Sequence, residues 1–156
     1  MTTNIELLEI MADFPWTGQV GVFSADNLPK ELAKMQTFDI ICNLSREKEE
    51  GTHFISISKR GPVIKYFDSL NLGLNAVSSI NEFILSCNPE KILEFNKQIQ
   101  SWDSSLCGLF ALLFLLNENP LLEHYENVES FSKKALMRND LICVKRLTMY
   151  ISAEKI

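Results

Sequence analysis

The sequence has no closely spaced cysteine pair, no excess of basic residues and no apolar run long enough to cross a bilayer. Its four cysteines lie at positions 42, 87, 107 and 143, so we expect neither a zinc site nor a disulfide framework, and a reducing environment. The net charge of −5 disfavours a protein whose main partner is nucleic acid. The uncharged run 106–116 is shorter than the roughly 20 residues that a membrane helix needs.

The N-terminal segment lacks the features of a secretion signal. Residues 1–14 contain Glu6, Glu9 and Asp13 among their apolar residues, and no basic region precedes an apolar stretch. We therefore expect an intracellular protein. A chain of 156 residues, 46% hydrophobic and 22% charged, predicts one domain over 1–156 with a substantial core.

The most informative stretch is 100–116, where a polar loop runs into an apolar segment that predicts a buried helix. Ser104 or Ser105 can cap this helix, which puts Cys107 in its first turn. The partial positive charge of a helix N-terminus, with an imidazolium nearby, favours the nucleophilic thiolate. The alternative interpretation is a small, buried, inert cysteine, because free cysteine is among the most buried residue types.

A β-hairpin is the clearest local structure, with two strands and a connecting turn over 52–58, 63–68 and 59–62. His53 and Asp68 then lie at the open end of neighbouring strands. If His53 is level with Phe67 or Asp68, the two side chains are within hydrogen-bond reach. Either residue alone is typical of an ordinary strand end. The only other histidine, His124, lies in a charged segment and is expected to be exposed.

Other segments alternate between helical and extended patterns, which predicts an α+β class. Thr3 or Asn4 can cap a first helix, and Asn75 can cap another over 76–87, whose apolar stripe is Val77, Ile80, Phe83, Ile84 and Cys87. Residues 91–100 alternate poorly, but their position between two helices favours a strand. The remaining predictions are a short extended piece between two turns over 16–29, a helical turn at 30–35, a strand at 38–44, a turn at 121–125, and helical segments at 128–137 and 140–151. In the last of these, Ile142, Cys143, Leu147, Met149 and Tyr150 are expected to face inward.

Four of these pieces, in this order and spacing, resemble the adenovirus-type cysteine endopeptidases (adenain). They are Gly-Thr-His-Phe at 51–54, Tyr-Phe-Asp-Ser-Leu at 66–70, Gln100, and Ser-Ser-Leu-Cys-Gly-Leu-Phe at 104–110. Residues 21–29 resemble a segment near the N-terminus of these viral enzymes, so the similarity covers 18–116. The SUMO proteases share the fold but usually have Asp where this chain has Leu106, which favours the viral branch.

The resemblance implies a papain-like fold: a mixed central sheet, a buried helix carrying the nucleophile, and a helical C-terminal layer. It implies Cys107 as nucleophile, His53 as base and acid, Asp68 as the residue that orients His53, and Gln100 as oxyanion donor. Gln98 is the alternative donor if the register differs by two. At the substrate, the resemblance implies Gly108, and Phe54 as an apolar cover where the family usually has Trp.

The implied activity is thiol-dependent endoproteolysis at small-residue sites of the Gly type, maturing viral structural proteins. The resemblance implies no metal or cofactor for the chemistry, protein or peptide substrates, no membrane, and a location in the host nucleus or cytoplasm and the virion. DNA activation is doubtful for an acidic chain, whereas an activating peptide remains open. Cys87 is the candidate to pair with such a peptide, or else a core cysteine.

Two other functions remain open from sequence. A deconjugating isopeptidase of the SUMO or ubiquitin type would use the same Cys-His-Asp arrangement, although this chain is shorter than such domains usually are. A catalytically silent interaction module would keep the fold, but it would not need all four site residues.

Overall fold

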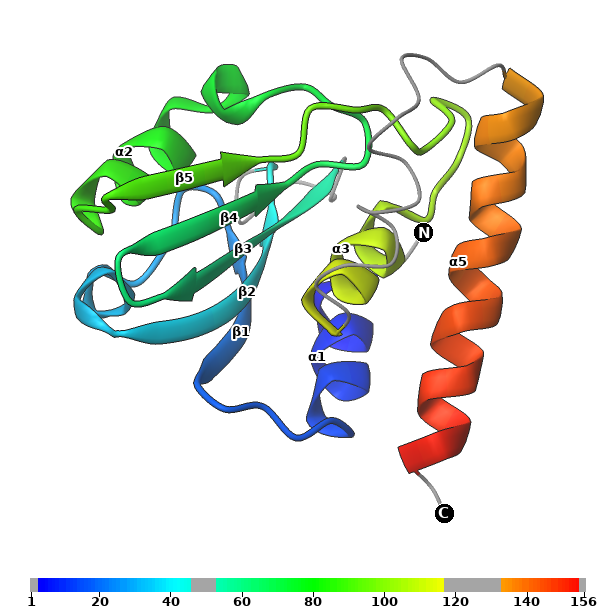
Figure 1. Cartoon of the computed structure of the whole chain (residues 1–156), viewed down its shortest axis with the longest axis horizontal. Coiled ribbons are helices and arrows are strands. Elements are labelled where there is room, and N and C mark those ends of the chain that lie inside the picture. The colour runs from blue at the N-terminus through cyan, green and yellow to red at the C-terminus, as the bar shows by residue number, and fades with distance from the viewer. Residues whose placement is uncertain (1–2, 46–52, 117–132, 155–156) are drawn as a thin grey trace.

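The computed structural model describes residues 3–45, 53–116 and 133–154, and it has the predicted α+β class. Its centre is a mixed five-stranded sheet in which the strands follow one another in chain order (Figure 1). The outer pairs β1–β2 and β4–β5 are parallel, and the inner pairs are antiparallel. The strands are β1 (Gln19–Ser24), β2 (Thr37–Asn43), β3 (Phe54–Arg60), β4 (Val63–Phe67) and β5 (Lys91–Glu94).

The N-terminal helix α1 (Asn4–Ala12) begins with the predicted cap. The Thr3 hydroxyl accepts a hydrogen bond from the backbone N–H of Glu6 at 3.2 Å, and the Glu6 carboxylate accepts one from the backbone N–H of Thr3 at 2.7 Å. This reciprocal pair satisfies two N–H groups that a helix start leaves free. Between β1 and β2 lies the predicted helical turn, η1 (Lys30–Lys34).

The hairpin of β3 and β4 is confirmed, with a tighter turn than predicted. Only Gly61 and Pro62 separate the strands, and Gly61 has φ +56°, a conformation that glycine adopts without steric cost. Ile55 and Ile57 pack toward one side of the sheet, whereas Phe54 belongs to the core on the other side. These side chains of β3 therefore alternate between the two faces of the sheet.

Helix α2 (Ser78–Ser86) covers the first of these sides, together with the short turn η2 (Leu74–Ala76). The predicted cap at Asn75 is wrong, because Asn75 lies within η2 and α2 starts after Val77, which makes no side-chain cap. The predicted apolar stripe is confirmed, since Ile80, Phe83, Ile84 and Cys87 are buried and Val77 packs against the same core.

Strand β5 is shorter than the predicted strand, which extended to residue 100. The chain leaves the regular ladder after Glu94 and continues as an irregular segment to Leu106. Backbone bonds still tie this segment to the end of β4, since Phe95 N–H donates to Tyr66 and the N–H groups of Ile99 and Gln100 donate to Ser69. The poor alternation of 95–100 reflects this change from strand to loop.

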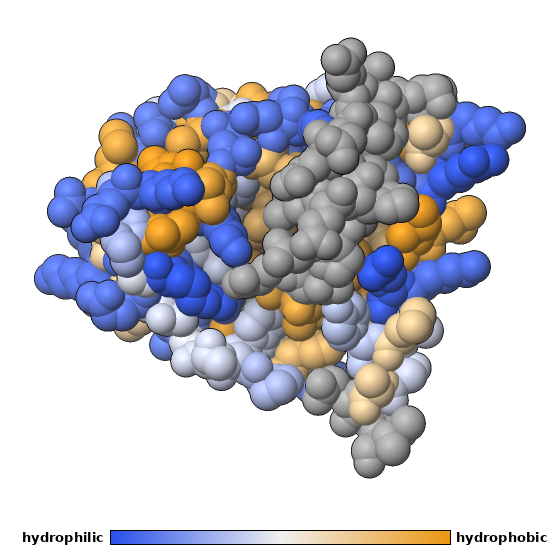
Figure 2. Space-filling view, viewed as in Figure 1, coloured by the Kyte–Doolittle hydropathy of each residue, from blue (hydrophilic) through white to orange (hydrophobic). Residues whose placement is uncertain are grey.

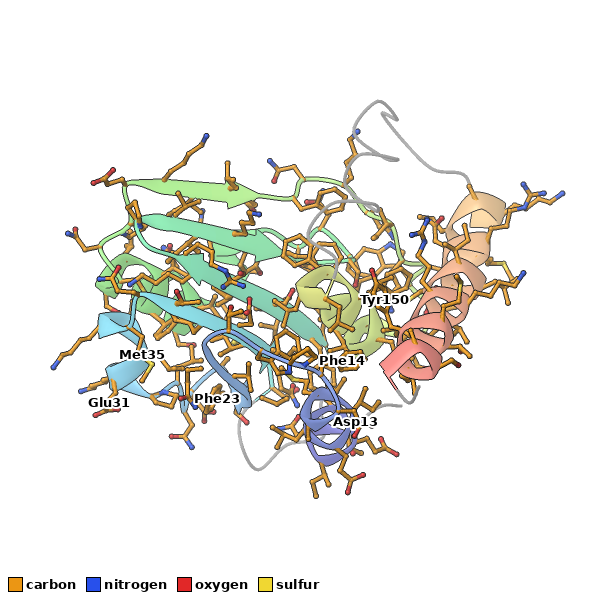
Figure 3. The ribbon with its side chains drawn as sticks, turned by 60° about the horizontal axis from the view of Figure 1, so that its bottom comes forward. Asp13, Phe14, Phe23, Glu31, Met35 and Tyr150 are labelled. Carbon is orange, nitrogen blue, oxygen red and sulfur yellow. The ribbon has the colours of Figure 1, made fainter. Side chains whose placement is uncertain are left out.

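Helix α3 (Cys107–Leu116) is wrapped by protein, as its composition predicts. All but two of its ten residues are buried, between the sheet on one side and α1 and α5 on the other (Figure 1). Tyr150 of α5 packs against the core that α3 forms with the sheet (Figure 3). No helix in the described parts of the chain is both long and apolar enough to cross a membrane.

The C-terminal layer is one helix, α5 (Lys133–Glu154), where the sequence predicted two segments. Cys143 and Leu147 face inward as expected, but Ile142 and Met149 are exposed, contrary to the prediction. Hydrophobic side chains remain visible along α5 on the right of Figure 2. The predicted turn at 121–125 and His124 lie outside the described residues.

Candidate active site

Three segments that are distant in the sequence meet at one end of the hairpin. His53 immediately precedes β3, Asp68 immediately follows β4, and Cys107 is the first residue of α3. The imidazole Nε2 of His53 lies 2.6 Å from Oδ1 of Asp68, and these side chains are only 6% and 1% exposed. The predicted partnership of His53 and Asp68 is therefore present in the structure.

The hairpin does not place His53 level with Phe67 or Asp68, as the sequence analysis supposed. Ser56 pairs with Phe67, so continuing the ladder would put Asp68 opposite Ile55 and His53 two residues farther along. The two side chains are diagonal rather than directly opposed neighbours. Diagonal neighbours on paired strands lie about 7 to 8 Å apart, and the imidazole and the carboxylate together span that distance.

The Asp68 carboxylate is fixed by the turn that follows β4. Besides the contact with His53, its Oδ1 accepts a hydrogen bond from the backbone N–H of Leu70 at 2.9 Å, and its Oδ2 accepts one from Leu72 at 2.8 Å. Aspartate commonly caps the backbone two residues ahead in this way. These bonds satisfy the buried carboxylate and hold it aimed at His53.

The imidazole of His53 is set up to carry a positive charge. Burial by itself lowers the pKa of His53, but the hydrogen bond with Asp68, the interaction with Cys107 and the charges of both groups outweigh burial and raise that pKa to about 9. Nδ1 is buried and has no aligned hydrogen-bond partner. Nε2, the other ring nitrogen, makes the contact with Asp68.

The Cys107 thiol responds in the opposite direction. Burial raises its pKa, but His53 and hydrogen bonds from the backbone N–H groups of Phe54 and Gly108 more than compensate, so the pKa of Cys107 is lowered. Burial instead raises the pKa of each of the other three cysteines, Cys42, Cys87 and Cys143. Cys107 is thus the only one of the four cysteines, all within the described residues, that favours the thiolate.

Gln100 is almost completely buried and lies in the irregular segment that leads into α3. Its side-chain oxygen accepts a hydrogen bond from the Ser69 hydroxyl at 2.5 Å, and its Nε2 donates to the backbone carbonyl of Ser104 at 2.9 Å. A primary amide has two N–H donors, so one remains beyond the bond to Ser104. The alternative donor, Gln98, directs its Nε2 to the carbonyl of Gln100 at 2.8 Å and so braces the same loop.

Ser104 has a different role from the cap that the sequence predicts. Its hydroxyl accepts a hydrogen bond from the backbone N–H of Leu106 at 3.3 Å, one residue before the helix begins. The first helical bond runs from the N–H of Phe110 to the carbonyl of Leu106. The serine therefore shapes the loop that leads into α3.

The two residues predicted at the substrate, Phe54 and Gly108, contribute to packing in the structure. Phe54 is only 2% exposed and lies in the core, so in this conformation its ring does not form an apolar cover over a substrate. A Cβ on Gly108 would lie 3.0 Å from Cδ1 of Leu7 and 3.4 Å from Cδ2 of Phe54. Both residues instead serve the site through their backbone N–H groups, which face the Cys107 sulfur.

Several residues around the site were not predicted from the sequence. Ser69 holds the Gln100 amide, while Asn139 of α5 bonds to the loop that carries Gln100. In the sequence, Asn139 looks like a boundary between two helices, so no local signal pointed to this contact. No cluster of three or more potential metal-ligating side chains occurs within 3–45, 53–116 and 133–154.

Comparisons with known proteins add little to this geometry. No family model matches the chain, and no curated protein matches it. Among solved structures, a selenomethionine crystal structure of the ASFV pS273R protease is similar, with a TM-score of 0.38 and 17% sequence identity over 65% of this chain. The chain spans 41% of the length of that protease.

Proposed function

We propose that this protein is a cysteine endopeptidase in which Cys107, His53 and Asp68 form the catalytic triad. The observation that carries the proposal is that Cys107 and His53 shift each other's pKa in opposite directions. The pKa of Cys107 is lowered, and the pKa of His53 is raised to about 9. A lowered thiol pKa beside a raised imidazole pKa favours the thiolate–imidazolium pair, which is the reactive state of a cysteine nucleophile. Strongly perturbed groups that meet in this way are typical of active sites.

The proposed reaction uses each group in turn. The Cys107 thiolate attacks the scissile carbonyl carbon, forming a C–S bond as the carbonyl electron pair moves onto oxygen. The His53 imidazolium then donates its proton to the amine nitrogen as the C–N bond breaks, leaving an acyl-enzyme. Water, deprotonated by His53, attacks the acyl carbon and expels the thiolate. Asp68 holds the imidazole in position throughout.

The developing oxyanion would be bound by the Gln100 amide and the backbone N–H of Cys107. In support of this role, the Gln100 amide is buried, fixed at its oxygen by Ser69, and left with a second N–H donor. A preorganised donor of this kind typically lowers the activation barrier by about 3 kcal/mol. The N-terminus of α3 adds a favourable dipole at the same place.

The finer parts of the proposal rest on the resemblance of residues 18–116 to adenain. They are a papain-like arrangement of the fold, cleavage after a small residue such as Gly, and viral precursor proteins as substrates in the infected cell and virion. An activating peptide belongs to the same set, and DNA activation is not proposed for this acidic chain. Cys87, the candidate to pair with a peptide, is buried and donates to the Phe83 carbonyl.

A fluorogenic peptide ending in Gly-Gly tests this proposal. The wild-type protein should release the fluorophore, and Cys107→Ala should lower kcat/KM by at least about a thousandfold, because no other group can form the acyl-enzyme. Cys87→Ala is the matched control, since it removes another buried thiol and should keep full activity.

Two results would contradict the proposal. Turnover that survives in Cys107→Ala would exclude this nucleophile. Cleavage of folded ubiquitin or SUMO conjugates, without cleavage of the peptide or of unfolded precursor segments, would replace the endopeptidase by a deconjugating isopeptidase.

A further inference from the structure

The loop that carries Gln100 has no regular secondary structure of its own. It runs from Phe95 to Leu106, between β5 and α3, and contains only a turn at Trp102 and Asp103. An irregular segment holds a side chain precisely only when other elements fix its backbone. Two elements outside the loop bond to it, the end of β4 and α5.

One side of the loop is attached to the end of β4. The backbone N–H groups of Ile99 and Gln100 both donate to the carbonyl of Ser69, at 2.9 and 3.0 Å, and the Ser69 hydroxyl donates to the Gln100 side chain. Ser69 is the residue directly after Asp68. These bonds couple the Gln100 amide to the carboxylate that holds His53.

The other side of the loop is attached to α5. Asn139 is only 3% exposed, and its Nδ2 donates to the backbone carbonyl of Ile99 at 2.9 Å, across 40 residues of sequence. Asn139 thus ties α5 to the loop at the residue directly before Gln100. Within the loop, the carbonyl of Ser104 accepts a hydrogen bond from the Gln100 amide.

We propose that Asn139 is a positioning residue that holds the Gln100 loop in the geometry that oxyanion stabilisation requires. This inference rests on the proposed endopeptidase function and extends it to α5, which lies outside the 18–116 region of the resemblance. Asn139 does not contact the reacting atoms. It acts through the loop, by fixing the backbone carbonyl of Ile99, the residue directly before Gln100.

The inference predicts a specific division between two reactions of Cys107. Alkylation by iodoacetamide needs only the thiolate, because the attack occurs at a saturated carbon and no oxyanion forms. Peptide hydrolysis also needs the oxyanion donor. A loosened loop should therefore slow hydrolysis and leave alkylation unchanged, whereas general damage to the fold would slow both.

The decisive experiment compares Asn139→Ala with Met137→Ala, a matched change on the same helix at a side chain that is 57% exposed. For Asn139→Ala we expect kcat for the Gly-Gly peptide to fall about a hundredfold, the loss typical of a small misplacement of a catalytic group. The alkylation rate of Cys107 should stay within about twofold of wild type, since Asn139→Ala leaves the thiol and its partner His53 in place and alkylation forms no oxyanion. Met137→Ala should match wild type in both reactions.

A second variant keeps the inference testable if Asn139→Ala does not fold. Asn139→Asp preserves the shape of the side chain but replaces the Nδ2 donor with an oxygen, which cannot donate to the Ile99 carbonyl when the carboxyl is ionised. We expect Asn139→Asp to lose turnover to a similar extent, with normal alkylation.

Three outcomes separate this inference from the proposed function. Undiminished turnover in a folded Asn139→Ala or Asn139→Asp would overturn the positioning role. Parallel losses of turnover and alkylation would assign Asn139 a purely structural role. If the wild-type protein hydrolyses no peptide while Cys107 is still alkylated, the proposed function itself fails.

Discussion

At the scale of single residues, the electrostatics of the site depend on Asp68. Its carboxylate accepts hydrogen bonds from His53, Leu70 and Leu72 although it is almost fully buried. A buried charge without partners is strongly destabilising, so this network is what permits a carboxylate here. The carboxylate then stabilises the imidazolium of His53, which stabilises the Cys107 thiolate.

The pH dependence of kcat/KM should follow from these displaced pKa values. Activity should rise as Cys107 deprotonates, at a pH below that of an ordinary thiol, and fall as His53 loses its proton near pH 9. In Asp68→Asn the imidazolium loses its partner, so the falling limb should move to lower pH and the rising limb to higher pH. We expect about a hundredfold loss of kcat/KM at pH 7.

The exposed Asp13 at the end of α1 provides the control, because Asp13→Asn removes a carboxylate away from the site (Figure 3). Its pH profile should match that of wild type. A profile of Asp68→Asn with unchanged limbs would contradict the role given to this carboxylate.

At this scale the sequence predicted the residues with strong local signals. Cys107 follows a polar loop at the start of an apolar run, and His53 and Asp68 flank an alternating hairpin. Ser69 and Asn139 could not be found in this way, because their roles arise from contacts over 31 and 40 residues of sequence. Nothing in the neighbouring residues encodes such a contact.

At the scale of elements, α1 supports the helix that carries Cys107. Leu7 is fully buried, and its side chain occupies the space that a Cβ on Gly108 would need. The residue after Cys107 is therefore a glycine that allows α1, α3 and Phe54 to approach closely. This contact anchors the first turn of α3.

Truncating Leu7 should destabilise the protein through this contact. Leu7→Ala should lower the free energy of unfolding by about 2 to 5 kcal/mol, the range for a buried leucine that leaves a cavity. Ile5→Ala, on the same helix but 68% exposed, should change it by less than about 0.5 kcal/mol. Urea denaturation measures both values, and equal effects of the two changes would show that α1 does not support α3.

Element types were more predictable than element ends. Alternation and helical spacing identified the hairpin, α2 and α3, because each buries a continuous face. The ends of β5 and α2 and the continuity of α5 depended on tertiary contacts instead. Asn139 reads as a helix boundary, but it lies inside α5 because its polar side chain bonds to the Gln100 loop.

At the scale of the whole molecule, the sheet separates two cores. One core lies under α2, and the other surrounds α3 and receives side chains from α1 and α5. Cys107, His53 and Asp68 meet at one end of the inner strands of the sheet, where β3 begins, β4 ends and α3 starts. The site is therefore a product of the complete fold.

The central claim, a Cys107 thiolate paired with the His53 imidazolium, is tested most directly by alkylation of the native protein. Iodoacetamide is added near pH 7, below the ordinary thiol pKa of about 8.5, and the label is located by peptide mass spectrometry. We predict rapid labelling of Cys107 ahead of the other cysteines, and slow labelling of Cys107 in His53→Ala. Preferential labelling of Cys42, Cys87 or Cys143, or a Cys107 rate that does not depend on His53, would contradict the account.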